Sequence, residues 1–206
     1  MGRNFSMLDV FALSFDYQEK PLLSQVEFSL APGQLLHLRG GNGAGKTTLL
    51  KLLAGLLLPN KGEIYYEGKL ITGDLTSYQQ KLCYVGHKTG LNPLLTVREN
   101  CFFDMHWGRR ALPFDALLEG FGLGDLSDEL CYHLSAGQRR RVGLLRTAMT
   151  NARLWLLDEP LVALDKAAIT TLMSCLEGHL VLGGQVILTS HQNLPINPGH
   201  YQEYSL

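Results

Sequence analysis

The chain has 206 residues, of which 46% are hydrophobic and 18% are charged, and its formal net charge is −1 at pH 7. This length suits one α/β domain with a substantial core and room for a subdomain. The near-neutral charge argues against a nucleic-acid partner, and we interpret the single basic run, residues 139–141, as a solvated helix face.

Neither the cysteines nor the apolar segments point to an extracellular or membrane-spanning protein. The four cysteines are far apart and lack metal-binding spacing, as expected for buried thiols in a reduced cytosolic setting. The most apolar stretch, residues 49–58, is shorter than the ~20 residues that cross a bilayer, and it contains Lys51. We therefore expect no membrane span.

Apolar and alternating segments predict the strands. Residues 26–30 alternate between apolar and polar side chains, which is typical of a half-exposed antiparallel strand, whereas residues 17–21 indicate a turn. The other expected strands are residues 8–15, 35–38, 62–66, 82–85, 154–157 and 186–189. We assign no element after His191. Short apolar strands separated by helices imply a mostly parallel sheet that is covered on both faces.

Helical patterns fill a central block of the chain. From residue 88 to about residue 150 the expected helices are 97–107, 113–121 and 136–149. Thr96 and Ser135 stand at N-cap positions, and Glu99 is at capping-box spacing from Thr96. Outside the block, helices are expected from residue 48 to about 55–59 and at 165–182.

These patterns predict one domain of the α/β class. We expect an α/β core formed by residues 1–87 and 151–206, with an antiparallel β portion near the N-terminus. A helical subdomain at about residues 88–150 is inserted into this core.

A glycine-rich loop between an expected strand and an expected helix carries the strongest chemical signal. It fits the pattern G-x-x-x-x-G-K-[ST] and comprises Gly40, Gly41, Asn42, Gly43, Ala44, Gly45, Lys46, Thr47 and Thr48. Glycines let successive backbone N–H groups converge on phosphates, and the N-terminus of the following helix attracts anions. Lys46 can reach the β- and γ-phosphates of ATP, and the Thr47 hydroxyl can bind Mg²⁺.

Two carboxylates follow the expected strand 154–157. In a parallel sheet, ligands bind beyond the carboxyl ends of the strands, which is where Asp158 and Glu159 fall. Asp158 is placed to hold Mg²⁺ through its water shell, and Glu159 is placed to polarise an attacking water.

A second small-residue segment opens the expected helix 136–149. Ser135, Ala136, Gly137 and Gln138 give it a capped helix N-terminus that can bind an anion. One triphosphate does not need two such helix ends in one chain. Both become useful if two copies of the protein clamp nucleotides head to tail.

Over nearly its whole length, the chain resembles the ATP-binding subunits of ABC transporters. Residues 40–47 resemble the Walker A loop, 154–159 the Walker B strand and 134–138 the signature motif, while Asp165 matches the D-loop and His191 the switch histidine. The resemblance implies a P-loop NTPase fold and a homodimer in which each ATP lies between one copy's loop and the other copy's signature. It also implies that Tyr17 stacks on adenine and that His191 contacts the γ-phosphate and holds Glu159 and its water in place.

Three positions depart from the family pattern. Gly41 replaces a common proline and Ala136 a common glycine, both small changes. His87 stands where most members have the Q-loop glutamine, which contacts Mg²⁺ and water and links the core to the helical subdomain. A neutral imidazole can accept a hydrogen bond or bind a metal as that glutamine does, but a protonated one cannot. We therefore expect His87 to make hydrolysis or coupling sensitive to pH.

Within this family, residues 86–87, 94–100, 134–142 and 188–192 resemble the ATPases of cytochrome c maturation, also called heme exporter subunits. This resemblance implies a peripheral protein at the cytoplasmic face of the bacterial inner membrane, bound to an integral membrane subunit and serving heme delivery to c-type cytochromes. Two alternatives are an ABC exporter subunit for another substrate and a soluble ABC ATPase outside transport. The single cassette and the near-neutral charge disfavour the second of these.

Overall fold

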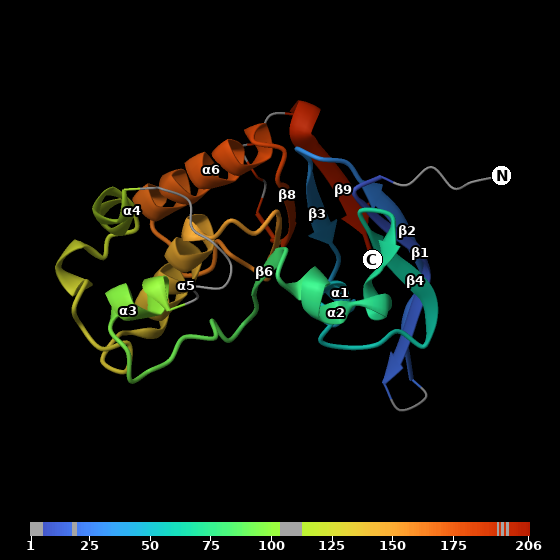
Figure 1. Ribbon diagram of the computed structural model, residues 1–206, viewed down its shortest axis with the longest axis horizontal. Helices are drawn as coiled ribbons and strands as arrows, with labels where there is room; N and C mark the ends of the chain where they lie inside the picture. Colours follow the sequence, from blue (N-terminus) through green and yellow to red (C-terminus); the bar gives the residue numbers. More distant parts are fainter. Residues whose placement is uncertain (1–5, 18–19, 104–112, 193, 195, 197) are drawn as a thin grey trace.

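The computed structural model describes residues 6–17, 20–103, 113–192, 194, 196 and 198–206. Within these residues, a five-stranded sheet lies at the centre of the molecule (Figure 1). Its strands, in spatial order, are β6 (Leu82–Val85), β7 (Leu154–Leu157), β8 (Gln185–Thr189), β3 (Leu35–Arg39) and β9 (Tyr201–Ser205). All neighbouring pairs run parallel, so their carboxyl ends gather at one edge of the sheet.

A second, antiparallel sheet contains the N-terminal strands and lies at the right of Figure 1. Its order is β2 (Lys20–Leu30), β1 (Leu8–Tyr17), β4 (Lys61–Tyr66) and β5 (Lys69–Leu70). The expected antiparallel strand 26–30 is confirmed as part of β2. The chain reverses within the expected turn at 17–21, as predicted, but the strands extend into that range, because Tyr17 pairs with Lys20 and Asp16 with Pro21.

The helices are divided between the two ends of the molecule. Their bounds are α1 (Lys46–Leu53), α2 (Leu75–Gln79), α3 (Val97–Phe102), α4 (Phe114–Gly120), α5 (Ala136–Met149) and α6 (Lys166–Val181). Short 3₁₀ turns cover Ile71–Gly73, Gly124–Leu126 and Pro198–His200. Helices α3, α4 and α5 lie together at the left of Figure 1, away from the antiparallel sheet. The last part of the expected helix 97–107 lies outside the described residues.

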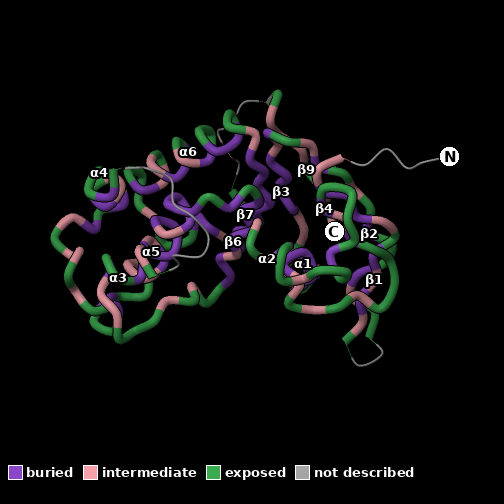
Figure 2. Tube along the Cα trace, in the orientation of Figure 1, coloured by how far each residue is buried: buried purple, intermediate pink, exposed green. Residues whose placement is uncertain are grey.

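Each face of the parallel sheet has its own apolar core, because strand side chains alternate between faces. On β7, Trp155 and Leu157 belong to a cluster with α5 and α6, whereas Leu154 and Leu156 belong to a cluster with α1 and the antiparallel sheet. Figure 2 shows the resulting band of buried residues along the central strands. The prediction of a parallel sheet covered on both faces is therefore confirmed.

Strand β9 falls in the segment after His191, to which the sequence assigned no element. It pairs in parallel with β3, with Leu36 opposite Gln202 and His37 opposite Glu203. As the last strand of the sheet it has one neighbour, so polar side chains such as Gln202 and Glu203 are tolerated on it. This polar composition explains why an apolar pattern did not reveal it.

Candidate active site

The glycine-rich loop joins β3 to α1, as predicted. Gly45 precedes the first helical residue with a φ of 100°, and a Cβ atom on it would lie 2.7 Å from Cδ2 of Leu23. Both facts require glycine, because other residues rarely adopt this conformation and have no room here. The loop therefore packs closely against β2, and the opposite surface of the loop is available to a ligand.

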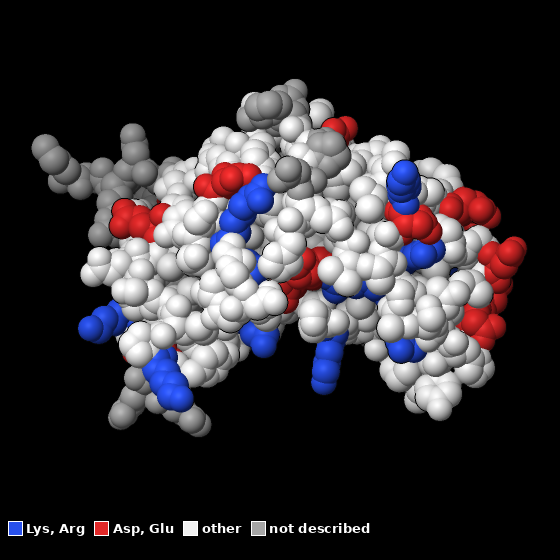
Figure 3. Space-filling model, turned by 180° about the vertical axis from the view of Figure 1, so that it is seen from behind, with Lys and Arg blue, Asp and Glu red and all other residues white. Residues whose placement is uncertain are grey.

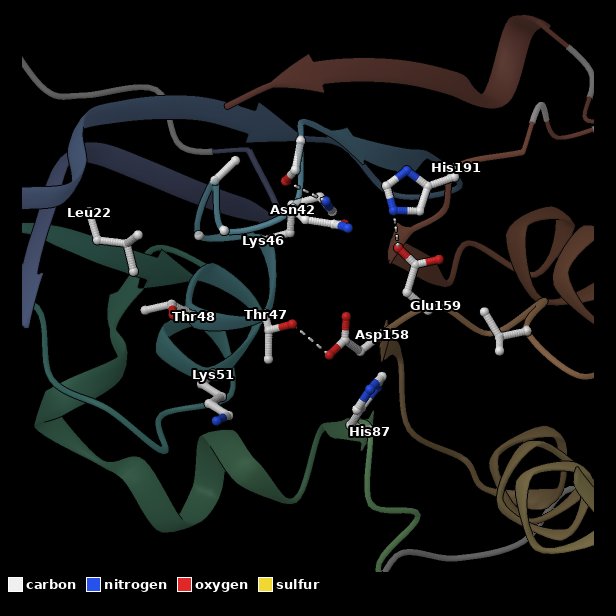
Figure 4. Close-up of a pocket in the computed structure, with 15 residues that line it drawn as sticks. Leu22, Asn42, Lys46, Thr47, Thr48, Lys51, His87, Asp158, Glu159 and His191 are labelled. Atoms are coloured by element: carbon white, nitrogen blue, oxygen red, sulfur yellow. Dashed lines mark hydrogen bonds and ion pairs between the residues drawn. The ribbon is translucent and has the colours of Figure 1, made fainter. Parts of the chain in front are cut away.

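Lys46 and Thr47, the first two residues of α1, are held by neighbouring oxygens. Nζ of Lys46 donates to the carbonyl oxygens of Gly40 at 2.7 Å and Gly41 at 3.0 Å. The Thr47 hydroxyl donates to Oδ2 of Asp158 at 2.8 Å, which joins the loop to the end of β7 (Figure 4). The two sequence motifs that were predicted to share one site thus lie side by side.

Thr189, at the end of β8, fixes the two carboxylates. Its hydroxyl donates to Oδ1 of Asp158 at 2.9 Å and accepts the backbone N–H of Glu159 at 2.7 Å. Asp158 is only 2% exposed, so both of its oxygens take their hydrogen bonds from neighbouring hydroxyls. Sequence reasoning missed Thr189, although the register that pairs Leu157 with Leu188 places Thr189 level with Asp158.

Glu159 has a strained backbone and faces His191. Its φ is 50°, a left-handed conformation that costs a non-glycine residue energy and that occurs often at functional sites. Its Oε1 lies 3.5 Å from Nε2 of His191, and Figure 4 shows the two side chains pointing toward each other. This proximity agrees with what the resemblance to ABC ATP-binding subunits implies for the two residues.

The buried His37, to which no sequence motif gives a role, lies beside the backbone that leads to His191. Nε2 of His37 donates to the carbonyl oxygen of Ser190 at 2.9 Å, and the Tyr201 hydroxyl lies 2.7 Å from Nδ1. Burial lowers the pKa of His37, an effect opposed by the Ser190 hydrogen bond, so the neutral ring is favoured. His37 therefore anchors the backbone immediately before His191.

One cavity of about 750 Å³ collects most of the predicted site. Its lining comprises Leu22, Gly41, Asn42, Gly43, Ala44, Gly45, Lys46, Thr47, Thr48, Lys51, His87, Asp158, Glu159, Val162 and His191. Of the predicted loop residues, Gly40 is not in the lining and contributes its carbonyl oxygen to Lys46.

The predicted signature residues lie beside a neighbouring cavity instead. Ser135 and Gln138 form a reciprocal capping box at the start of α5. Ala136 and Gly137 line a cavity of about 180 Å³ together with His87, Arg140, Glu159, Val162 and Ala163.

Asp165 and Tyr17 also lie apart from the larger cavity. Asp165 caps α6 and forms an ion pair with Arg141 at 3.2 Å. Tyr17 is 47% exposed and packs edge-on against Phe15, with ring centroids 4.8 Å apart. Its role as an adenine platform stays a prediction, and Leu22 is the β2 side chain in the cavity lining.

The arginines of residues 139–141 do not form a solvated helix face, so that interpretation is wrong. Arg140 is only 8% exposed and donates to two backbone carbonyls, while Arg139 donates to the carbonyl of Leu134. Elsewhere the surface is mixed: on the face in Figure 3, Lys and Arg side chains are interspersed with Asp and Glu.

The residues present fit a phosphate-bound Mg²⁺ ion. The Thr47 hydroxyl and the Asp158 carboxylate are hard oxygen donors that already lie 2.8 Å apart. Among the described residues, no group of three or more His, Cys, Asp and Glu side chains could hold a metal by itself. This suits an ion that takes its remaining ligands from phosphate and water.

A strand, a glycine loop and a helix, with a buried carboxylate at the end of another parallel strand of the same sheet, define a P-loop nucleotide-binding protein. Residues 23–162 match the ABC transporter family. The cytochrome c biogenesis ATP-binding export protein CcmA of Legionella pneumophila (strain Lens) is 54% identical over 200 residues, which cover 97% of this chain and 100% of the relative. Its counterpart from Dechloromonas aromatica (strain RCB) is 41% identical over 203 residues, with 97% and 100% coverage.

Solved structures agree with this class. An ATP-binding subunit of an ABC transporter superimposes with a TM-score of 0.82 at 27% identity, covering 90% of this chain and 80% of the other. A dimeric ATP-binding cassette in a post-hydrolysis state, bound to ADP and phosphate, gives 0.77 at 25% identity, covering 90% and 88%. The chain belongs to the ABC transporter family and, within it, to the CcmA proteins. It is accordingly an ATPase subunit of the ABC type.

Among the described residues, none of the helices has the length and apolarity needed to cross a membrane.

Proposed function

We propose that the chain hydrolyses ATP to energise a membrane partner in heme delivery for c-type cytochrome biogenesis. The names of the CcmA relatives support this assignment. In this proposal the chain works as a homodimer on the integral membrane subunits of the cytochrome c maturation system. It is peripheral to the inner membrane, at its cytoplasmic face.

The phosphates of ATP are bound by the glycine-rich loop. Lys46, the loop N–H groups of residues 40–48 and the N-terminus of α1 supply positive charge to them. Tyr17 stacks on the adenine. Thr47, Asp158 and His87 would hold Mg²⁺, which when bound neutralises charge on the β- and γ-phosphates. The distance of 2.8 Å between Thr47 and Asp158 supports this part of the proposal.

Hydrolysis depends on Glu159 and His191. The Glu159 carboxylate polarises a water for in-line attack on the γ-phosphorus, and His191 keeps the carboxylate turned toward that water. Lys46 and the N–H groups of Ser135, Ala136, Gly137 and Gln138 from the second copy stabilise the charge that develops on the γ-phosphate. Asp165 completes the interface between the copies. The contact of 3.5 Å between Glu159 and His191 at the cavity is the observation that carries this mechanism.

Motion passes to the membrane partner through the helical subdomain, which we place at about residues 88–150. His87, two residues after the end of β6, lines the nucleotide cavity and begins the connection between core and subdomain. Closure of the dimer on two ATP molecules and its reopening after hydrolysis would move the subdomain and its partner helices together.

Substitution Glu159→Gln tests the mechanism. It removes the carboxylate that polarises water but keeps the side chain's size, so ATP turnover of the complex with its membrane partner should fall at least about 100-fold. ATP binding should persist, and ATP-bound dimers of the subunit should accumulate, as measured by light scattering. In cells, the variant should leave c-type cytochromes without heme.

Glu177→Gln is the matched control, because Glu177 is an exposed glutamate on α6 and should tolerate the same change. Normal turnover in Glu159→Gln would remove this residue from its role. Lost turnover combined with fully heme-loaded c-type cytochromes would instead assign the complex to the export of another substrate.

A further inference from the structure

One side chain ties helix α5 to both strand ends of the proposed catalytic site. Nη1 of Arg140 donates to the carbonyl oxygen of Gly86 at 2.6 Å, and Nη2 donates to the carbonyl oxygen of Asp158. Gly86 directly follows β6 and precedes His87, while Asp158 directly follows β7 and precedes Glu159. Arg140 is therefore hydrogen-bonded to the backbone of the residue immediately before His87 and of the residue immediately before Glu159.

The chemistry of this contact requires arginine. A guanidinium is a planar fork whose N–H groups can serve two acceptors at once, whereas a lysine ammonium acts as a point charge on a flexible stem. Both acceptors are carbonyl oxygens, so only a donor satisfies them. Burial lowers the pKa of Arg140, and the nearby Asp158 and Glu159 carboxylates oppose this shift. Burying a charged group costs free energy unless the group is paired or hydrogen-bonded. The burial of Arg140 therefore indicates that its hydrogen bonds to the two carbonyl oxygens have a structural role.

Arg140 also stands about one helical turn from the proposed signature. The helix begins at Ala136, and Ala136, Gly137 and Arg140 line the same small cavity as His87 and Glu159. The next residue, Arg141, turns to another element and pairs with Asp165. Consecutive arginines thus link one helix to the catalytic strand ends and to the start of α6.

We propose that Arg140 is a positioning residue that couples the two ATP sites of the dimer. The inference rests on the proposed function, in which the signature of one copy contacts the ATP of the other. When the start of α5 responds to the partner's ATP, Arg140 carries that displacement to the backbone of His87 and Glu159 in its own copy. Each copy's hydrolytic geometry then depends on whether the other site is filled.

The test compares Arg140→Met, Arg140→Lys and Arg146→Met in the complex with its membrane partner. Arg146 is a matched control on the same helix, because its Nη1 donates to a glycine carbonyl, that of Gly90, at 3.3 Å, away from both strand ends. The readouts are ATP turnover as a function of ATP concentration, its Hill coefficient, and binding of a fluorescent ATP analogue to the subunit.

In wild type, two sites that close together should give a Hill coefficient above 1. Arg140→Met should reduce kcat at least about tenfold and bring the Hill coefficient to about 1. Its affinity for the analogue should stay within about twofold, because the loop contacts remain. Arg140→Lys keeps the charge but loses the planar fork whose two nitrogens reach separate strand ends, so its kcat and Hill coefficient should fall between those of wild type and Arg140→Met. Arg146→Met should behave as wild type.

Unchanged cooperativity and kcat in Arg140→Met would overturn the inference, as would equal losses of analogue binding and turnover, which indicate general structural damage. If Arg140→Met does not fold, the split between kcat and binding in Arg140→Lys decides. Failure of the proposed function would be seen in different measurements. Either the wild-type protein would not hydrolyse ATP, or the Glu159→Gln variant would hydrolyse ATP normally.

Discussion

The buried polar side chains around the cavity mainly form hydrogen bonds with backbone groups. Thr189 accepts the N–H of Glu159, His37 donates to the carbonyl of Ser190, and Arg140 donates to those of Gly86 and Asp158. Each supports a segment that carries a proposed catalytic residue. Because an unpaired buried polar group costs about 1–3 kcal/mol, these side chains hold the segments in one arrangement.

His37 gives the protein an acid-sensitive stability. Burial holds the pKa of folded His37 below the ordinary value of 6.5, so as pH falls below 6.5 the unfolded chain binds a proton that the folded chain does not. The free energy of unfolding should therefore fall with pH from 6.5 down to the folded pKa, by up to about 1.4 kcal/mol per pH unit from this group. His37→Gln, which can still donate to Ser190, should flatten this dependence in denaturant unfolding between pH 7.5 and 5.

His133→Gln is the control, because His133 is an exposed histidine changed in the same way. Equal slopes for wild type and His37→Gln would show that His37 does not titrate differently in the two states.

Local signals in the sequence predicted the helix starts well. The capping boxes at Thr96 with Glu99 and at Ser135 with Gln138 are both present, because all the partners lie within four residues. The reversal between β1 and β2 was predicted from local residues, whereas strand β9 was missed because its pairing depends on a distant segment. The supporting residues His37 and Arg140 were missed for the same reason, since their carbonyl partners lie 153 and 54 residues away.

Loss of the Thr96 cap should destabilise α3. Its hydroxyl accepts the N–H of Glu99 at 3.1 Å, while the Glu99 carboxylate accepts the N–H of Thr96 at 2.8 Å. Thr96→Ala should lower the free energy of unfolding by about 1 kcal/mol, measured by denaturant titration. Thr170→Ala is the matched control: Thr170 is exposed inside α6 and its hydroxyl bonds back to Lys166, so alanine there should be neutral or slightly stabilising. Equal effects at both positions would remove the cap as the cause.

In the whole molecule, the proposed phosphate site and the proposed signature of the same copy are neighbours. His87, Glu159 and Val162 line both cavities and form the boundary between them. The sequence predicted both halves from their motifs, and the parallel sheet explains why His87, Asp158 and Glu159 meet the glycine-rich loop at one edge. The sequence did not predict that the two sites lie on either side of shared residues, because this arrangement depends on how α5 packs against β6 and β7.

Nucleotide binding should stabilise the whole domain, because a ligand that binds only the folded state adds its binding free energy to unfolding. With ATP and Mg²⁺ at about 100 times Kd, the gain is about 2.7 kcal/mol, or roughly 5–10 °C in Tm for a chain of this size.

Glu159→Gln is the suitable background for thermal scans, since it should not consume the ligand. Adding Lys46→Ala removes the ammonium that faces the phosphates and should abolish most of the shift, whereas Lys69→Ala, an exposed lysine on β5, should preserve it. Chelation of Mg²⁺ should reduce the shift in the Lys69→Ala protein as well, because Thr47 and Asp158 are proposed to hold the ion against the phosphates. A full shift in the Lys46→Ala protein would place the phosphates away from the glycine-rich loop.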